Sequence, residues 1–166
     1  KHRLIEGDNL PVMRGLLATH TETIKLIYID PPYNTGKGFT YDDNRGDEWE
    51  EMMTDRLNVA HRLLRTDGAI VIHIDEHELA RLTILMDERF GRENRLGTIV
   101  WDKKNPKGDA NAIAVQHESI VCYAKNKAEF HPLERAKPNV EAMLKKASEL
   151  MGTLGQVRLP PDLAKA

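Results

Sequence analysis

Lys25-Leu26-Ile27-Tyr28-Ile29-Asp30-Pro31-Pro32-Tyr33-Asn34 carries more information about the fold than any other stretch of the chain. Residues 26–29 are apolar or aromatic, which is typical of a buried strand. The two prolines after Asp30 cannot donate to a β-ladder, so the strand should end there. We therefore expect a strand over residues 25–30 that delivers the Asp30 carboxylate to its carboxyl end.

The flanking sequence alternates between helical and strand-like patterns. Apolar spacing predicts helices over residues 10–17, 49–64, 79–90 and 140–151, and strands over residues 69–74, 97–102 and 119–124. Asp67-Gly68 is expected to close the second helix, and Asp75 with Glu78 has capping-box spacing for the third. This order predicts an α/β fold whose sheet is mostly parallel, with an antiparallel hairpin at its edge.

Two of the predicted strands deliver an aspartate to the same rim of the sheet, Asp30 after the first and Asp75 after the second. Ligands of open α/β sheets collect at the carboxyl ends of the strands, so both are candidates for function. For Asp75, helix capping alone is an equally good explanation.

Composition limits the classes of protein that need considering. The chain has 166 residues, with 24 Lys and Arg against 26 Asp and Glu, so any contact with nucleic acid must come from a local patch. The single cysteine, Cys122, excludes an internal disulfide and resembles a small buried hydrophobe. The His residues lack metal-ligand spacing, so we expect no metal. Without an apolar run long enough for a membrane or a signal peptide, a cytoplasmic protein is expected.

The side chains around the double proline suggest a specific chemistry. Proline lacks an N–H and fixes φ, so the carbonyls of Pro31 and Pro32 are expected to face outward without local partners. Together with the Asp30 carboxylate they offer acceptors to both hydrogens of an exocyclic amino group, while the Tyr33 ring stacks on the base that carries it. Holding both hydrogens exposes the nitrogen lone pair to an electrophile and stabilises the positive charge that then develops.

At this point the sequence resembles DNA amino-methyltransferases of the adenine-N6 type. The stretch from Leu26 to Gly36 is similar to their catalytic motif, and Gly7-Asp8-Asn9-Leu10 to the segment that precedes it. His73-Ile74-Asp75, Phe90-Gly91 and Trp101 with Asn105 follow in the family's order. The resemblance covers roughly the first three quarters of the chain and is greatest to β-class enzymes, in particular the modification subunit of type III restriction systems.

The resemblance implies methyl transfer from S-adenosylmethionine to the N6 of an adenine flipped out of duplex DNA, on a Rossmann-like methyltransferase sheet. It implies catalytic roles for Asp30, Pro31, Pro32 and Tyr33. The cofactor would be bound by Asp8 and Asp30, and the substrate by Tyr33, Asn34, Trp101, Lys103 and Asn105. It also implies a homodimer and a helicase-nuclease restriction subunit as partners.

One family element is absent from the sequence. A glycine-rich Phe-x-Gly-x-Gly cofactor loop is not found, and in β-class enzymes it lies downstream of the target-recognition region. We therefore expect the chain to be an incomplete, amino-terminal portion of a methyltransferase. Residues 1–135 would form its catalytic portion, and residues 136–166 a helical segment leading toward an absent target-recognition region.

Several alternatives stay open. Asp8 could simply cap a helix, and Lys103, Lys104 and Lys107 could form a solvated loop with no phosphate contact. Cytosine N4, an RNA adenine or a protein glutamine could be the methyl acceptor, although cytosine-N4 enzymes commonly carry Ser at the position of Asp30. A catalytically incomplete fragment that binds DNA or a partner subunit is the alternative from outside the enzyme class.

Overall fold

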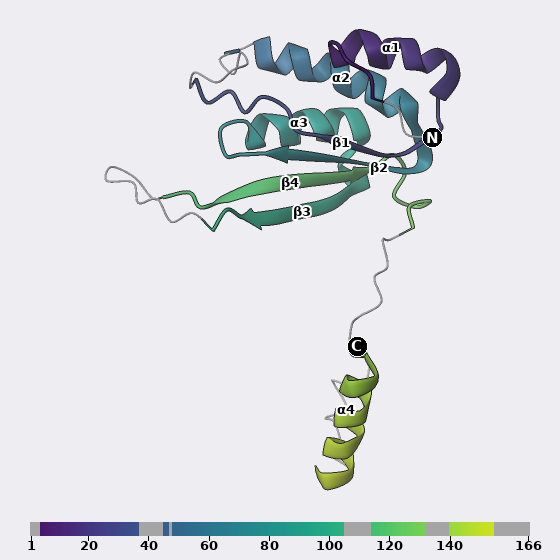
Figure 1. Cartoon of the computed structure of the whole chain (residues 1–166), viewed down its shortest axis with the longest axis vertical. Coiled ribbons are helices and arrows are strands. Elements are labelled where there is room, and N and C mark those ends of the chain that lie inside the picture. Colours follow the sequence, from purple (N-terminus) through teal and green to yellow (C-terminus); the bar gives the residue numbers. More distant parts are fainter. Residues whose placement is uncertain (1–3, 37–44, 47, 105–113, 132–139, 155–166) are drawn as a thin grey trace. The chain divides into compact units, whose positions relative to one another are not determined.

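The computed structural model describes residues 4–36, 45–46, 48–104, 114–131 and 140–154 (Figure 1). The chain divides into two compact units, Lys1–His131 and Pro132–Ala166. The roles predicted for residues 1–135 and 136–166 stay predictions. The first unit is a four-stranded sheet with helices on one face, and the second contains a single described helix, α4 (Val140–Leu154).

Three α-helices belong to the first unit. The first, α1 (Asn9–His20), begins after Asp8, whose carboxylate accepts a hydrogen bond from the backbone N–H of Leu10 at 2.9 Å. It packs on α2 (Glu48–Leu63), as Figure 1 shows. α2 and α3 (Leu79–Phe90) supply much of the core. Their fully buried side chains include Trp49, Met53, Leu57, Ala60, Leu82 and Met86.

The sheet has the strand order β1-β2-β4-β3. β1 (Ile24–Ile29) and β2 (Leu64–Ile74) pair in parallel, while β4 (His117–Ala124) pairs antiparallel with both β2 and β3 (Arg95–Asp102). The α/β fold and the edge hairpin are confirmed. The expectation of a mostly parallel sheet needs correction, because β4 lies between β2 and β3 and runs antiparallel to both. Three strands share a direction, yet only one of the three pairings is parallel.

The structure also corrects the second strand and the helix starts and ends near it. β2 begins at Leu64, directly after α2, so Asp67-Gly68 lies inside the strand instead of closing the helix. The register between β1 and β2 shifts there, from Ile24 opposite Leu64 to Leu26 opposite Ala69. Gly68 occupies this irregularity, where a Cβ atom would meet three backbone carbonyl oxygens at 3.0–3.1 Å. Only glycine fits this close approach without displacing the neighbouring strand.

The predicted capping box before α3 does not form. Asp75 instead accepts a hydrogen bond from the backbone N–H of His77 at 3.0 Å, and Glu78 at the N-cap makes no side-chain capping bond. The Asp75 side chain thus forms a local turn, because aspartate readily bonds the backbone two residues onward. Glu78 is left with its side chain buried and turned to other partners.

The two faces of the sheet differ in what covers them. Ile70, Ile72 and Ile74 of β2 are fully buried under α2 and α3. The alternate residues point to the opposite face, which no described helix covers. That face carries large side chains that are more than half exposed: Leu26, Tyr28, Ile99 and Trp101. We call it the open face of the sheet. Within the described residues, no helix is long and apolar enough to cross a membrane.

Candidate active site

The Asp30–Tyr33 motif follows β1 at the carboxyl end of the sheet, where sequence reasoning placed it. Asp30, Pro31, Pro32 and Tyr33 line a hollow of about 430 Å³. Asp30 is exposed and Pro31 is buried, so the motif combines an accessible carboxylate with a fixed backbone. The four predicted catalytic residues therefore share one cavity.

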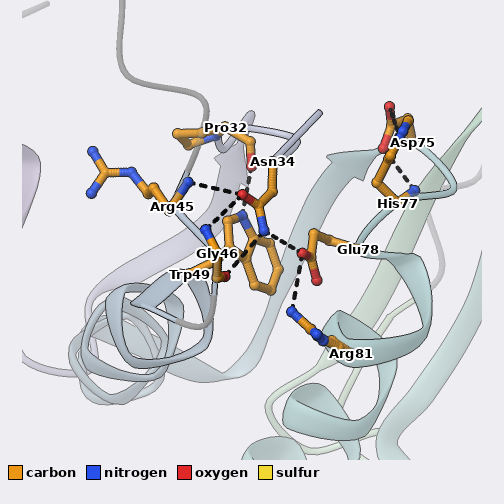
Figure 2. Close-up of polar contacts among 9 residues, drawn as sticks. All are labelled: Pro32, Asn34, Arg45, Gly46, Trp49, Asp75, His77, Glu78 and Arg81. Atoms are coloured by element: carbon orange, nitrogen blue, oxygen red, sulfur yellow. Dashed lines mark hydrogen bonds and ion pairs between the residues drawn. The ribbon is translucent and has the colours of Figure 1, made fainter. Parts of the chain in front are cut away.

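The two proline carbonyls are not equivalent. The indole Nε1 of Trp49 donates a hydrogen bond to the Pro32 carbonyl at 2.6 Å, so the expectation that both carbonyls lack partners is wrong for Pro32 (Figure 2). Among the described residues, the Pro31 carbonyl accepts no hydrogen bond. The acceptor pair left for a ligand is the Asp30 carboxylate and the Pro31 carbonyl.

The Tyr33 hydroxyl lies among carboxylates. Burial, followed by the negative charges of Asp30 and Glu118, a hydrogen bond to the Asp30 carboxylate and the charge of Asp75, raises the pKa of Tyr33 well above its usual value. Its ring is tilted against the His73 imidazole, with 6.2 Å between ring centroids. The phenol is consequently neutral across the physiological range, which suits a residue that stacks on a base and does not act as a proton acceptor.

A chain of polar contacts crosses the open face beside the motif. The Tyr28 hydroxyl lies 3.2 Å from His73 Nδ1, and His73 Nε2 lies 2.9 Å from a Glu118 carboxylate oxygen. The other Glu118 oxygen pairs with Lys103 Nζ at 3.1 Å. His73 is therefore hydrogen-bonded at Nδ1, while its Nε2 is in close contact with Glu118 without hydrogen-bond geometry. Neither Glu118 nor this chain was anticipated, because pairing across strands is not visible in the sequence.

The residues predicted to bind substrate differ in where the structure places them. The Trp101 ring is 55% exposed and lies 6.5 Å from the His73 ring, so Trp101 and Tyr33 flank the same histidine. Lys103 is held by Glu118, which leaves it less suited to binding a phosphate. Asn105 lies outside the described residues.

Asn34 is surrounded by protein groups. Its side-chain oxygen accepts from the backbone N–H groups of Arg45 and Gly46, at 2.9 and 3.0 Å. Its side-chain nitrogen donates to the Gly46 carbonyl at 3.1 Å and to the Glu78 carboxylate at 2.6 Å. The structure thus brings Asn34 to the motif but directs its amide into the protein (Figure 2).

Two further aspartates were candidates. The Asp8 carboxylate caps α1 and also accepts from Arg56 at 3.1 Å, and with Arg56 it borders a second hollow of about 400 Å³. Asp75 is buried and its second oxygen lies 2.8 Å from His77 Nδ1. Asp75, Glu76 and His77 form the one group of three described residues whose ligand atoms lie close enough for a metal. Since Asp75 and His77 already bond each other, we interpret the group as a strand-to-helix turn.

The comparisons with known proteins define the class first. The family model described as DNA methylase, N6_N4_Mtase, matches residues 24–155. The chain therefore belongs to the N6/N4 DNA methylase family.

Individual relatives give the same class. The chain is 38% identical over 162 residues to the Mod subunit of the type III restriction-modification enzyme EcoP15I of Escherichia coli, a match that covers 78% of this chain and 25% of that protein. It is 44% identical over 131 residues to the type II methyltransferase M.KpnI of Klebsiella pneumoniae, covering 72% of this chain and 31% of that protein. The chain thus spans about a quarter to a third of these relatives.

Solved structures support the fold. The PvuII cytosine-N4-specific DNA methyltransferase superposes with a TM-score of 0.55 at 15% identity, over 88% of this chain and 61% of that one. The S-adenosylmethionine complex of M1.HpyAVI superposes with a TM-score of 0.51 at 17% identity, over 80% and 60%. The predicted methyltransferase fold is confirmed.

Proposed function

We propose that this protein transfers a methyl group from S-adenosylmethionine to the N6 amino group of adenine in duplex DNA, as part of a restriction-modification system. The observation that carries the proposal is the hollow lined by Asp30, Pro31, Pro32 and Tyr33, which offers two acceptors: the Asp30 carboxylate and the Pro31 carbonyl, to which no described residue donates. Membership of the DNA methylase family supports the reaction class.

The two acceptors explain how the amino group becomes reactive. An amino nitrogen conjugated to a purine is a weak nucleophile because its lone pair is delocalised into the ring. Hydrogen bonds to Asp30 and to the Pro31 carbonyl hold both hydrogens and favour a pyramidal nitrogen. As the methyl group bonds to the nitrogen, its bond to the donor sulfur breaks and the sulfur keeps the electron pair. Positive charge grows on the nitrogen, and the fixed carboxylate and carbonyl dipole stabilise it. The nitrogen then loses one proton, for which the Asp30 carboxylate or water is the acceptor.

Tyr33 holds the base while this happens. Its neutral ring offers a flat, half-buried surface for stacking, and such contacts are worth about 1–3 kcal/mol per base. Since the base must leave its helix to enter the hollow, we propose that the target adenine is flipped. Trp101, on the other side of His73, offers a second exposed ring on the same part of the sheet.

The cofactor supplies an electrophilic methyl group on a cationic sulfonium. The residues present fit such a group, since the accessible Asp30 carboxylate lies in the hollow and complements a positive charge. We propose that Asp30 serves this side of the reaction as well as the amino group. The 400 Å³ hollow bordered by Asp8 is the other candidate surface for the cofactor.

Two assembly proposals accompany the activity. The name of the E. coli relative describes a subunit of a restriction-modification enzyme. By analogy we propose a restriction subunit as partner and a homodimer as the form of this subunit. Cytosine N4 presents the same kind of amino group and is the second candidate acceptor. The Asp30 carboxylate favours adenine, by resemblance to the adenine-N6 motif.

The test is transfer of tritiated methyl from S-adenosylmethionine to unmethylated genomic DNA by the protein as encoded. Asp30→Ala should lower the rate at least about 100-fold, as expected when a transition-state contact is removed. Glu22→Ala is the control, because the Glu22 carboxylate pairs with Lys125 just before the amino end of β1, at the opposite end of that strand from Asp30, and its loss should keep the wild-type rate. Hydrolysis of the DNA should yield N6-methyladenine. A wild-type rate in Asp30→Ala, or N4-methylcytosine as the product, would overturn the proposal.

A further inference from the structure

We propose that Asn34 is a positioning residue, which holds the Asp30–Tyr33 motif in its reactive geometry by joining it to Arg45 and Gly46, just before α2, and to the buried Glu78 at the N-cap of α3, and that it does not bind substrate. The inference rests on the proposed function for its kinetic part. It also makes a structural prediction that is independent of methyl transfer.

The Asn34 side chain is saturated with hydrogen bonds. A carboxamide oxygen has two lone pairs and its nitrogen has two hydrogens. Protein groups occupy all four positions of Asn34: two backbone N–H groups at the oxygen, one carbonyl and one carboxylate at the nitrogen. The donors lie at one end and the acceptors at the other, so only one orientation of the amide fits (Figure 2). A base or phosphate could bind Asn34 only after one of these bonds breaks.

The backbone of Asn34 also suits a positioning role. Its φ is +60°, in the left-handed region that asparagine tolerates better than most residues. This turn follows Tyr33 directly and aims the side chain back toward Gly46, twelve residues later. The Asn34 side chain thus joins the start of the connection between β1 and α2 to its end.

Glu78, the carboxylate partner of Asn34, is buried. Its side chain is 4% exposed, and one of its oxygens accepts from Asn34 at 2.6 Å and from Arg81 at 3.3 Å. The other oxygen is buried without a hydrogen-bond partner among the described residues. A buried carboxylate is costly unless it is paired, so the bond from Asn34 matters to both groups.

The residues before and after Tyr33 in the chain are both held by hydrogen bonds. Trp49 of α2 holds the Pro32 carbonyl before it, and the Asn34 amide is fixed after it. With both neighbours fixed, the Tyr33 ring and the Pro31 carbonyl keep their places relative to Asp30. Small misplacements of reacting groups can cost about 100-fold in rate, so loss of the Asn34 contacts should lower kcat. It should leave KM for DNA nearly unchanged, because no substrate contact is lost.

The experiment exchanges the donor and the acceptor of the Asn34–Glu78 hydrogen bond. Asn34→Asp keeps the shape and the acceptors for Arg45 and Gly46, but places a carboxylate against Glu78. Glu78→Gln alone keeps an oxygen that can accept from Asn34. In the double variant, the new glutamine amide can donate to the new aspartate, so the contact with residue 78 is restored in reverse, while the bond to the Gly46 carbonyl stays lost in both variants.

The kinetic expectation is specific. Asn34→Asp should lower kcat about 10- to 100-fold with KM for DNA within about 2-fold of wild type. Glu78→Gln should stay within about 3-fold of wild type, and the double variant should recover most of the lost kcat. An unchanged kcat in Asn34→Asp, a double variant no better than Asn34→Asp, or a raised KM with unchanged kcat would each overturn the inference.

A second readout does not need the proposed reaction. Trypsin cleavage at the Arg45–Gly46 bond, followed by mass spectrometry, should be faster in Asn34→Asp than in wild type, and slow again in the double variant. If the protein shows no methyl transfer but this pattern holds, the proposed function fails while the structural role of Asn34 stands. Equal cleavage rates in wild type and Asn34→Asp would overturn the structural role.

Discussion

The indole N–H of Trp49 donates to the Pro32 carbonyl at 2.6 Å, across seventeen residues of sequence. Trp49 is fully buried and lies in the first turn of α2, so the core of the domain directly determines the geometry of the residues lining the 430 Å³ hollow. The bond also separates the two proline carbonyls, because it occupies Pro32 and leaves Pro31 available.

Trp49→Phe should destabilise the protein and slow methyl transfer. Phenylalanine retains most of the buried aromatic surface but leaves the Pro32 carbonyl without its donor, which costs about 1–3 kcal/mol. Urea unfolding should show the loss, and the single-turnover rate should fall with it. Trp101→Phe is the control for stability, since Trp101 is 55% exposed. Equal unfolding midpoints for Trp49→Phe and wild type would contradict the prediction.

Tyr33 should not ionise at the pH where a free tyrosine does. Burial and the surrounding carboxylates raise its pKa, so the neutral phenol persists through the usual tyrosine value of about 10. We expect the absorbance change at 295 nm up to about pH 10.5 to be the same in wild type and Tyr33→Phe. A smaller change in the variant would show that Tyr33 titrates normally.

His61 should make stability depend on pH. Burial, then the charges of Arg89 and Lys125, lower the pKa of His61 in the folded state. Below about pH 6.5 the unfolded chain therefore binds a proton more readily than the folded one, and stability falls as the pH decreases. His61→Gln should show a smaller drop in urea midpoint between pH 7.5 and 5.5. Parallel midpoint curves for the two proteins would refute this.

Tyr123 anchors β4 to α3 and β3 through its hydroxyl. The group donates to Asp87 at 2.6 Å and accepts from Arg95 Nε at 2.8 Å, with the side chain fully buried. Tyr123→Phe should lower the free energy of unfolding by about 1.5–3 kcal/mol, the range for hydrogen bonds to charged groups. Tyr28→Phe serves as the control because Tyr28 is 57% exposed. A loss no greater than that of the control would count against this role.

Local patterns predicted most of the elements but not how the strands pair. The strand before Asp30 and the helix over residues 79–90 follow from periodicity and from the residues that end them, Pro31 and Gly91. The insertion of β4 between β2 and β3 depends on contacts distant in sequence, which periodicity does not report. Gly68 was predicted to end a helix. Glycine is favoured both at helix C-termini and where two strands approach closely, and the local sequence does not distinguish the two.

The sequence predicted the residues that line the hollow, but not the residues from other elements that hold them in place. Asp30, Pro31, Pro32 and Tyr33 were predicted because they adjoin one another in the chain. Trp49 and Glu78 belong to other parts of the chain. In the sequence, Trp49 lies on an apolar helical face and Glu78 at a capping position, and these roles explained both residues without any link to the hollow. The helical face that contains Trp49 predicted its burial correctly, but no pattern indicates that an indole N–H meets a proline carbonyl.

The placement of β4 also restricts the order in which the sheet can assemble. β3 pairs only with β4 among the described strands, so it has no edge to join until β4 is present. β2 and β4 are separated by α3, a short 3-10 helix (Arg92–Asn94) and β3, and by more than forty residues from Ile74 to His117, a distance that makes their encounter entropically demanding. We therefore expect the β3–β4 hairpin to join β2 as one unit, and substitutions at the β2–β4 pairing to slow folding more than those at the outer edge.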